Sequence, residues 1–170
     1  MVKLPPGKAY MEKIFTDIIN AHRGIIYKIC NLYCRDEAYK KDLFQEIVLQ
    51  LWKSYPSFRK EAKSSTWIYR VALNTAIANF RKEIRKPDTA PLTDASFWIP
   101  EIEYPLEKEH ITALMQAIDQ LNKLEKAIVL LYLEEKTYDE ISEIIGMTNS
   151  NVGVRLNRIK AKLGKIIKIN

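Results

Sequence analysis

The stretch 137-TYDEISEIIGMTNSNVGVRLNRIKAKL-163 holds the start and stop signals of one helix and the start signal of a second. Thr137 and Glu140 form the spacing of a capping box, which predicts that a helix begins here. Gly146 is suited to end this helix in a left-handed conformation, and Thr148 can cap the next helix. A short helix, a turn of about three residues and a longer helix in series predict a helix-turn-helix, a motif that commonly binds DNA.

The longer helix of this motif carries an apolar stripe and a basic stripe side by side. The apolar residues follow helical spacing and are expected to face inward: Val152, Leu156, Ile159 and Leu163. From residue 148 to the end there are basic side chains and no acidic one: Arg155, Arg158, Lys160, Lys162, Lys165 and Lys168. We therefore expect this helix to bind duplex DNA. Asn151 and Arg155 are best placed for base edges, and Arg158, Lys160 and Lys162 for phosphates.

Apolar residues recur every three or four positions along nearly the whole chain, which predicts an all-α protein of two small domains. The first half is expected to hold three or four helices, marked by residues 11–19, 25–33, 36–54 and 64–82, the last capped by Ser64 or Ser65. Two further helices, around 111–118 and 128–133, precede the helix-turn-helix. Four of the seven prolines lie between residues 87 and 105. They predict a linker over 86–107 between domains at 1–85 and 108–170.

Composition limits the classes of function. The chain has 170 residues, a formal net charge of +6 and a pI of about 9.2, which permits a polyanionic partner. No signal peptide or membrane-length apolar run is evident, so we expect a cytoplasmic protein without membrane insertion. Cys30 and Cys34 are expected to be reduced and buried, and His22 and His110 are isolated. We therefore expect no metal, no cofactor and no enzymatic activity.

The segment 64–82 carries an unusual strip beside its apolar face. On a helical wheel Trp67, Arg70, Asn74, Arg81 and Arg85 fall on one side. An aromatic ring, an amide and guanidinium groups together suit a nucleic acid whose bases are unstacked. A bundle helix with extended arginines and a half-buried tryptophan would give the same pattern, so the residues alone leave both interpretations open.

Two segments together resemble a known family. The segment 42-DLFQEIVLQLW-52, Phe58 and 66-TWIYRVALNTAIANFRK-82 resemble the second conserved region of bacterial sigma factors. Residues 121–163 resemble their fourth region. Because only these two regions are present, the chain is identified as a member of the extracytoplasmic-function (ECF) group of the sigma-70 family. In the recognition helix, Gly153 and Val154 stand where many relatives have an Arg-Ser pair, which puts the family's minus-thirty-five preference in doubt.

The resemblance implies a sigma factor that binds bacterial core RNA polymerase and directs promoter recognition, promoter melting and transcription initiation. The core polymerase would be bound by Asp42, Leu43, Gln45 and Glu46. The melted minus-ten element would be bound by Trp67, Arg70, Asn74 and Arg81. The minus-thirty-five duplex would be bound by Thr148, Asn149, Ser150, Asn151, Arg155, Arg158, Lys160 and Lys162.

The sequence also leads to expectations about binding partners and to alternative functions. Relatives are commonly held inactive by an anti-sigma factor, so such a partner is possible, and we expect a monomer when free. Phe97, Trp98 and Ile99 in the linker are expected to dock on a domain or a partner. The main alternative is a helix-turn-helix regulator that binds duplex DNA without being a sigma subunit. A further alternative is a helical protein-interaction module with an incidental basic tail.

Overall fold

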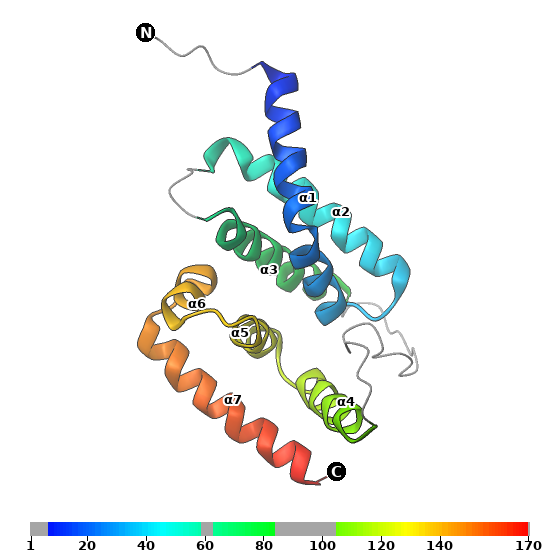
Figure 1. The fold of residues 1–170 in the computed structure, drawn as a ribbon, viewed down its shortest axis with the longest axis vertical. Helices are drawn as coiled ribbons and strands as arrows, with labels where there is room; N and C mark the ends of the chain where they lie inside the picture. Colours follow the sequence, from blue (N-terminus) through cyan, green and yellow to red (C-terminus); the bar gives the residue numbers. More distant parts are fainter. Residues whose placement is uncertain (1–6, 59–62, 84–104, 170) are drawn as a thin grey trace.

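The computed structural model describes residues 7–58, 63–83 and 105–169, and every regular element in these ranges is a helix (Figure 1). This confirms the predicted all-α fold class. The first half contains α1 (Lys8–Tyr33), α2 (Glu37–Ser54), the 3₁₀ turn η1 (Tyr55–Ser57) and α3 (Ser64–Glu83). The second half contains α4 (Pro105–Asp119), α5 (Lys123–Leu133), α6 (Tyr138–Ile145) and α7 (Asn149–Ile169).

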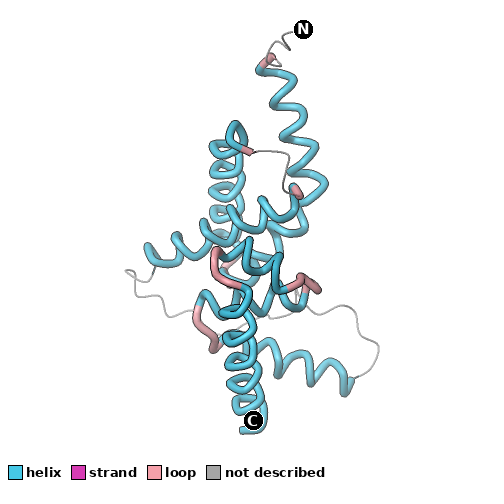
Figure 2. The backbone as a smooth tube through the Cα atoms, turned by 90° about the vertical axis from the view of Figure 1, so that its left-hand side faces the viewer, coloured by secondary structure: helices cyan, strands magenta, loops and turns pink. Residues whose placement is uncertain are grey.

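The helices α1, α2 and α3 form a three-helix bundle around one apolar core. Each of the three packs on the other two, with α3 in contact with both neighbours along much of its length (Figures 1 and 2). The most buried side chains of this bundle are aliphatic and come from all three helices: Ile26, Ile29, Ile47, Leu51, Ile68 and Leu73. The core therefore fixes the rotation of each helix about its own axis, and with it the side chains that each presents outward.

The first helix differs from the prediction. The two helices expected around 11–19 and 25–33 are one continuous helix of 26 residues, α1. Its buried residues Phe15, Ile19, Ile26 and Ile29 keep a single stripe through the expected break. Gly24 lies inside the helix and is exposed. One glycine costs only about 1 kcal/mol relative to alanine, which a long packed helix absorbs.

The starts of α2 and α3 show one confirmed boundary and one error. Asp36 caps α2, because its carboxylate accepts hydrogen bonds from the backbone nitrogens of Ala38 at 2.8 Å and Tyr39 at 3.2 Å. The prediction that Ser64 or Ser65 caps α3 is wrong, since both lie inside the helix. The carbonyl of Lys63 already accepts the first helical bond, from the nitrogen of Trp67 at 3.2 Å. The Ser64 hydroxyl instead lies 3.5 Å from Nε2 of His22 on α1.

The helix-turn-helix is present with the predicted caps. The Thr137 hydroxyl accepts a bond from the backbone nitrogen of Glu140, whose carboxylate accepts one from the nitrogen of Thr137. Gly146 ends α6 with a φ of 76°, in the left-handed region. The Thr148 hydroxyl accepts from the nitrogen of Asn151 at 3.3 Å at the start of α7. The four residues of the predicted inward stripe of α7 are buried.

Two features of the second half differ from expectation or were missed. Helix α4 begins at Pro105, so the linker boundary predicted at residue 107 falls inside a helix. Proline fits the first turn of a helix, where a backbone N–H has no partner within the helix. A second capping box, Asn122 with Glu125, starts α5 and was not predicted. Phe97, Trp98, Ile99 and Arg85 lie outside the described residues.

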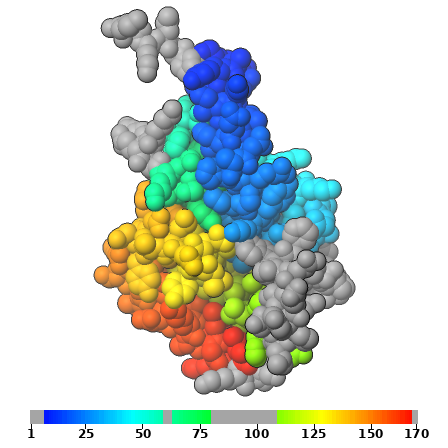
Figure 3. Space-filling model, in the orientation of Figure 1, coloured from blue at the N-terminus to red at the C-terminus, as the bar shows by residue number. Residues whose placement is uncertain are grey.

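The two halves pack directly on each other. Helix α3 contacts α6 and α5 (Figure 1), and the space-filling view shows the first half seated against the second (Figure 3). At one end of this interface the Tyr33 hydroxyl donates to the carbonyl of Lys123 at 2.6 Å, and Arg35 pairs with Asp119 at 2.7 Å. These bonds hold the C-terminal end of α1 to the turn between α4 and α5.

Glu134, just after α5, is the polar centre of the same interface. Its carboxylate pairs with Lys28 of α1 at 2.5 Å and accepts a hydrogen bond from the Tyr69 hydroxyl of α3 at 3.3 Å. The ammonium group of Lys136 lies 5.7 Å from the centre of the Tyr69 ring. A single carboxylate therefore joins helices from both halves.

Candidate nucleic-acid and protein-binding surfaces

Helix α3 presents a polar strip to solvent because its opposite face is buried. Tyr69, Ala72, Leu73 and Ala76 lie in the core. Arg70 and Asn74 lie on the other side and are exposed. Asn74 follows Arg70 by four residues, so the two side chains are neighbours on the helix surface. Of the other strip members, Arg81 lies in α3 but its side chain is outside the described part, as is all of Arg85.

Trp67 is half-buried, and its ring is held by other aromatic rings. It stacks on Phe58 with ring centres 4.5 Å apart and an interplanar angle of 27°. Tyr55 lies 6.2 Å away and continues the cluster towards Trp52, whose ring is stacked 6.3 Å from it. Aromatic pairs at these distances restrict the rings they join. Trp67 is half-buried, as expected of a bundle helix. It also lies on the same side of α3 as exposed Arg70 and Asn74, as expected of a strip that binds unstacked bases.

The fold divides the predicted polymerase-binding residues of α2 between the surface and the core. Asp42 and Gln45 are exposed, and Glu46 is half-buried and accepts a hydrogen bond from Gln50 at 2.7 Å. Leu43, the other residue of the predicted set, is only 5% exposed and packs in the core. Leu49, not singled out from the sequence, is 44% exposed. It follows Gln45 by four residues, and this helical spacing on the side opposite the buried stripe could have identified it.

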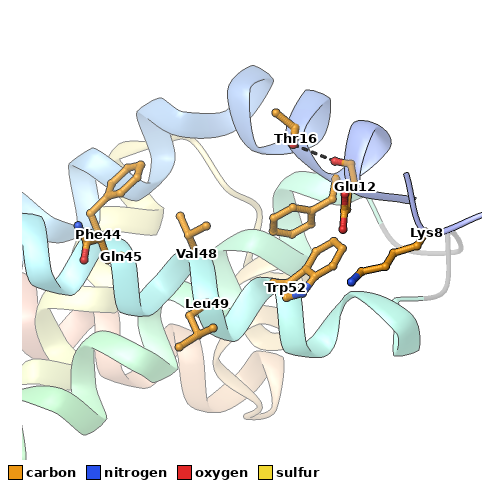
Figure 4. Close-up of a pocket in the computed structure, with 9 residues that line it drawn as sticks. Lys8, Glu12, Thr16, Phe44, Gln45, Val48, Leu49 and Trp52 are labelled. Carbon is orange, nitrogen blue, oxygen red and sulfur yellow. Dashed lines mark hydrogen bonds between the residues drawn. The ribbon is translucent and has the colours of Figure 1, made fainter. Parts of the chain in front are cut away.

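An open groove runs beside this face, between the N-terminal half of α1 and α2 (Figure 4). Its volume is about 550 Å³. Val48 and Trp52 of α2 form its floor, and Glu12 and Thr16 lie above them on α1. Leu49 and Gln45 stand at its edge, so the groove and the exposed face of α2 form one continuous surface.

The predicted duplex-binding residues of α7 fall into two groups. Asn151, Arg155 and Arg158 are exposed along the helix, and Ser150 is exposed beside them. The other members have partners within the protein. Asn149 donates to Asp139 at 2.5 Å, Lys160 donates to the Tyr132 hydroxyl at 3.0 Å, and Lys162 pairs with Glu125 at 2.9 Å. Thr148 is exposed but caps α7.

Two acidic side chains near this surface, Glu125 and Glu140, have lowered pKa values. Burial opposes ionisation of Glu125, but hydrogen bonds from Lys162 and the backbone of Asn122, with the charge of Arg155, lower its pKa overall. The backbone N–H of Thr137 chiefly lowers the pKa of Glu140. Because both acids belong to capping boxes, charge and backbone geometry stabilise the same helix starts.

Gly153 lies on the flank of α7 that faces the start of α6. A Cβ atom at this position would lie 3.5 Å from Cε2 of Tyr138, an ordinary contact distance. The Tyr138 ring therefore lies where a long side chain at position 153 would extend. Val154, the next residue, is 49% exposed.

The described residues also bear on cysteine reactivity, metal binding and membrane-spanning helices. Cys30 and Cys34 are both buried, and burial, with the neighbouring Cys34 thiol, raises the pKa of Cys30 to about 12. Within the described ranges, no three His, Cys, Asp or Glu side chains are grouped so as to hold a metal ion. None of the described helices is both long and apolar enough to cross a membrane.

Comparisons with known proteins agree on one family. Residues 18–86 match the family model described as Sigma-70 region 2, and residues 111–163 match the one described as Sigma-70, region 4. The chain is 29% identical to the ECF RNA polymerase sigma factor SigW of Bacillus subtilis, over 92% of this chain and 90% of SigW. It is 23% identical to the ECF RNA polymerase sigma factor SigM of Mycobacterium tuberculosis, over 90% of this chain and 76% of SigM.

Solved structures share the fold. The sigma factor RpoE of Bartonella quintana, solved in complex with the anti-sigma factor NepR, superposes with a TM-score of 0.69 at 14% identity. The match covers 93% of this chain and 99% of RpoE. CnrH, solved in complex with the cytosolic domain of CnrY, gives a TM-score of 0.67 at 14% identity, over 94% of this chain and 90% of CnrH.

Proposed function

The chain belongs to the extracytoplasmic-function group of the sigma-70 family, and from this premise we propose how its surfaces divide the work of transcription initiation. It is a sigma factor, which binds core RNA polymerase and promoter DNA. The observation that carries this conclusion is that regions 2 and 4 both match, in order, on one chain. The alternative of a helix-turn-helix regulator that works without polymerase is not favoured, since it leaves the match to region 2 unexplained.

We assign core-polymerase binding to the outer face of α2. Asp42, Gln45 and Glu46 provide acidic and amide groups, and exposed Leu49 provides an apolar centre among them. Protein interfaces combine a buried apolar anchor with a polar rim in this way. Leu43 supports this face from the core and is not part of the contact.

We assign the two promoter elements to different helices. The exposed Arg70 and Asn74 of α3, with Trp67 beside them, suit unpaired bases of the minus-ten element, and we assign Arg81 of the same helix to this element with them. The exposed Asn151, Arg155 and Arg158 of α7 suit the minus-thirty-five duplex. Lys160 and Lys162 would have to exchange Tyr132 and Glu125 for phosphates, because each is paired within the protein.

The remaining expectations follow from the partners. Sigma factors typically act by binding and not by catalysis, and we propose no enzymatic role and no cofactor for this chain. We place it in the cytoplasm, where the polymerase and chromosomal DNA lie. The two solved structures described above each hold a second protein, which in one case is a named anti-sigma factor. We propose that a regulator of this kind also holds this chain.

The direct test is co-elution of the purified chain with bacterial core RNA polymerase on a sizing column, at salt high enough to screen nonspecific attraction to the basic tail. We expect a stable complex. Leu49→Asp should abolish it, because the change puts a charge at the apolar centre of the α2 face. Ile167→Asp, which charges another exposed aliphatic position, on α7, is the matched control and should still bind.

A folded chain that binds duplex DNA but never co-elutes with core polymerase would contradict the proposal and favour the regulator. A complex that Leu49→Asp leaves intact would keep the sigma function but remove α2 as the docking face.

A further inference from the structure

The orientation of α7 is fixed by its buried stripe, and this determines which residue points most directly outward. Val152, Leu156 and Ile159 are at most 2% exposed. Val154 follows Val152 by two residues, a rotation of about 200° at 3.6 residues per turn. It therefore points away from the core, and it is 49% exposed.

The surroundings of Val154 on the helix surface are polar. Its neighbours one turn away are Ser150, Asn151, Asn157 and Arg158, all exposed. Among the described residues of α7, Val154 and Ile167 are the exposed large aliphatic side chains, and Ile167 lies near the far end. Val154 is thus an isolated apolar group beside Asn151 and Arg158, two of the residues to which we assign duplex binding.

Gly153, the preceding residue, carries no side chain of its own. A Cβ atom there would lie 3.5 Å from Cε2 of Tyr138, whose ring occupies that flank of α7. Glycine and valine are also weak helix formers, so Gly153 and Val154 contribute little to the stability of α7. A single exposed valine is common on protein surfaces and carries no meaning alone. Its place beside Asn151 and Arg158, two of the residues to which we assign duplex binding, is what gives it one.

In the major groove, the C5-methyl group of thymine is the one apolar group that distinguishes bases. A valine can neither donate nor accept a hydrogen bond, so it can select a base only through such a contact. Resting on the proposed duplex binding by α7, we propose that Val154 reads the methyl group of a thymine in the minus-thirty-five element. Val154 would then help to set promoter preference at the position where this chain departs from many relatives.

The test removes the methyl group from the DNA and the side chain from the protein separately. A preferred duplex is first selected from a random library with the holoenzyme, and each thymine of its minus-thirty-five element is replaced in turn by deoxyuridine. We expect one replacement to weaken wild-type binding by roughly three- to fivefold, the effect of one buried methyl group. Val154→Ala should lose most of this difference, because its shorter side chain draws back from the methyl group.

The matched control is Ile167→Ala, which shortens the other exposed aliphatic side chain of α7 and should keep the full sensitivity to deoxyuridine. If Val154→Ala retains the wild-type sensitivity, or if no replacement affects the wild type, the inference is wrong while the sigma function stands. If the holoenzyme selects no preferred duplex at all, duplex reading by α7 fails and the inference fails with it.

Discussion

At the scale of single residues, Asn74 is the sharpest test of the α3 strip. It is exposed and four residues beyond Arg70, and its amide can pair with a base edge. Base-edge contacts are worth roughly 1–3 kcal/mol, so Asn74→Ala should slow open-complex formation by about tenfold. Duplex binding through α7 should persist. The measurement is promoter opening by the holoenzyme, followed with a fluorescent base in the minus-ten element.

Asn79→Ala is a fitting control, because it makes the same change on another face of α3, where the side chain is half-buried. Promoter opening that is unchanged by Asn74→Ala would show that the strip is a solvated helix face with no role in DNA binding. The sequence alone left this interpretation open.

The buried thiol of Cys30 and two buried tyrosine hydroxyls predict that the protein loses stability at alkaline pH. The folded protein keeps the thiol proton of Cys30 to about pH 12, whereas an exposed thiol releases it near 9.0. Unfolding is therefore increasingly favoured between these values, by roughly 1.4 kcal/mol per pH unit. Burial also raises the pKa of the Tyr33 and Tyr69 hydroxyls, which acts in the same direction. The stabilisation is complete below about pH 9 and declines above it.

Urea unfolding between about pH 8 and about pH 10 measures this decline. Cys30→Ala should unfold more easily at every pH because it leaves a cavity, but its free energy of unfolding should fall less steeply with pH. Equal slopes for the two proteins would rule out the thiol as the cause.

At the scale of elements, two glycines of the helix-turn-helix should respond in opposite ways to alanine. Gly146 has a φ of 76°, a conformation that costs alanine about 1–2 kcal/mol. Gly153 lies within α7, and an added Cβ would meet Tyr138 only at ordinary contact distance. Gly153→Ala should therefore stabilise the protein by about 1 kcal/mol, and Gly146→Ala should destabilise it. Thermal unfolding of the two variants gives the comparison, and a destabilising Gly153→Ala would mean that the Tyr138 ring cannot give way.

Local signals account for what the sequence predicted well. Thr137, Glu140 and Gly146 act through neighbours within four residues, so their spacing alone predicted the caps of α6. The cap of α3 failed for a related reason. Serine is favoured at several positions near a helix start, and the structure places Lys63, not a serine, immediately before the first helical residue. Family motifs also name residues without separating core from surface, which is why buried Leu43 was grouped with exposed Asp42.

At the scale of the whole molecule, the contact between halves was beyond sequence reasoning. Tyr33 meets Lys123, and Lys28 meets Glu134, across 90 and 106 residues. No local spacing predicts such pairs. They matter because the two promoter elements, about 25 base pairs apart, are separated by roughly 85 Å of duplex. A compact protein of this length has a radius of gyration of about 15 Å. We therefore expect the packed halves to separate before both elements are bound at once.

Glu134 is the group whose loss should favour that separation. Its carboxylate joins Lys28 and Tyr69 of the first half, and its side chain is 24% exposed. A hydrogen bond to a charged group contributes about 1.5–3 kcal/mol. The lower end applies here, since Lys28 is 40% exposed and partly screened by solvent. We expect Glu134→Ala to raise the radius of gyration measured by small-angle X-ray scattering while the helix content stays unchanged.

Glu135→Ala is the control for this change, because Glu135 is the next residue and is exposed, and no side-chain bond joins it to the first half in the described ranges. Glu135 has a φ of 57°, and alanine is strained in this conformation as glutamate is, so the backbone strain is the same in the variant. A Glu134→Ala protein as compact as the wild type would show that apolar packing of α3 on α5 and α6 holds the halves together without the carboxylate. Opening would then have to be driven by polymerase or DNA binding and not by the loss of one ion pair.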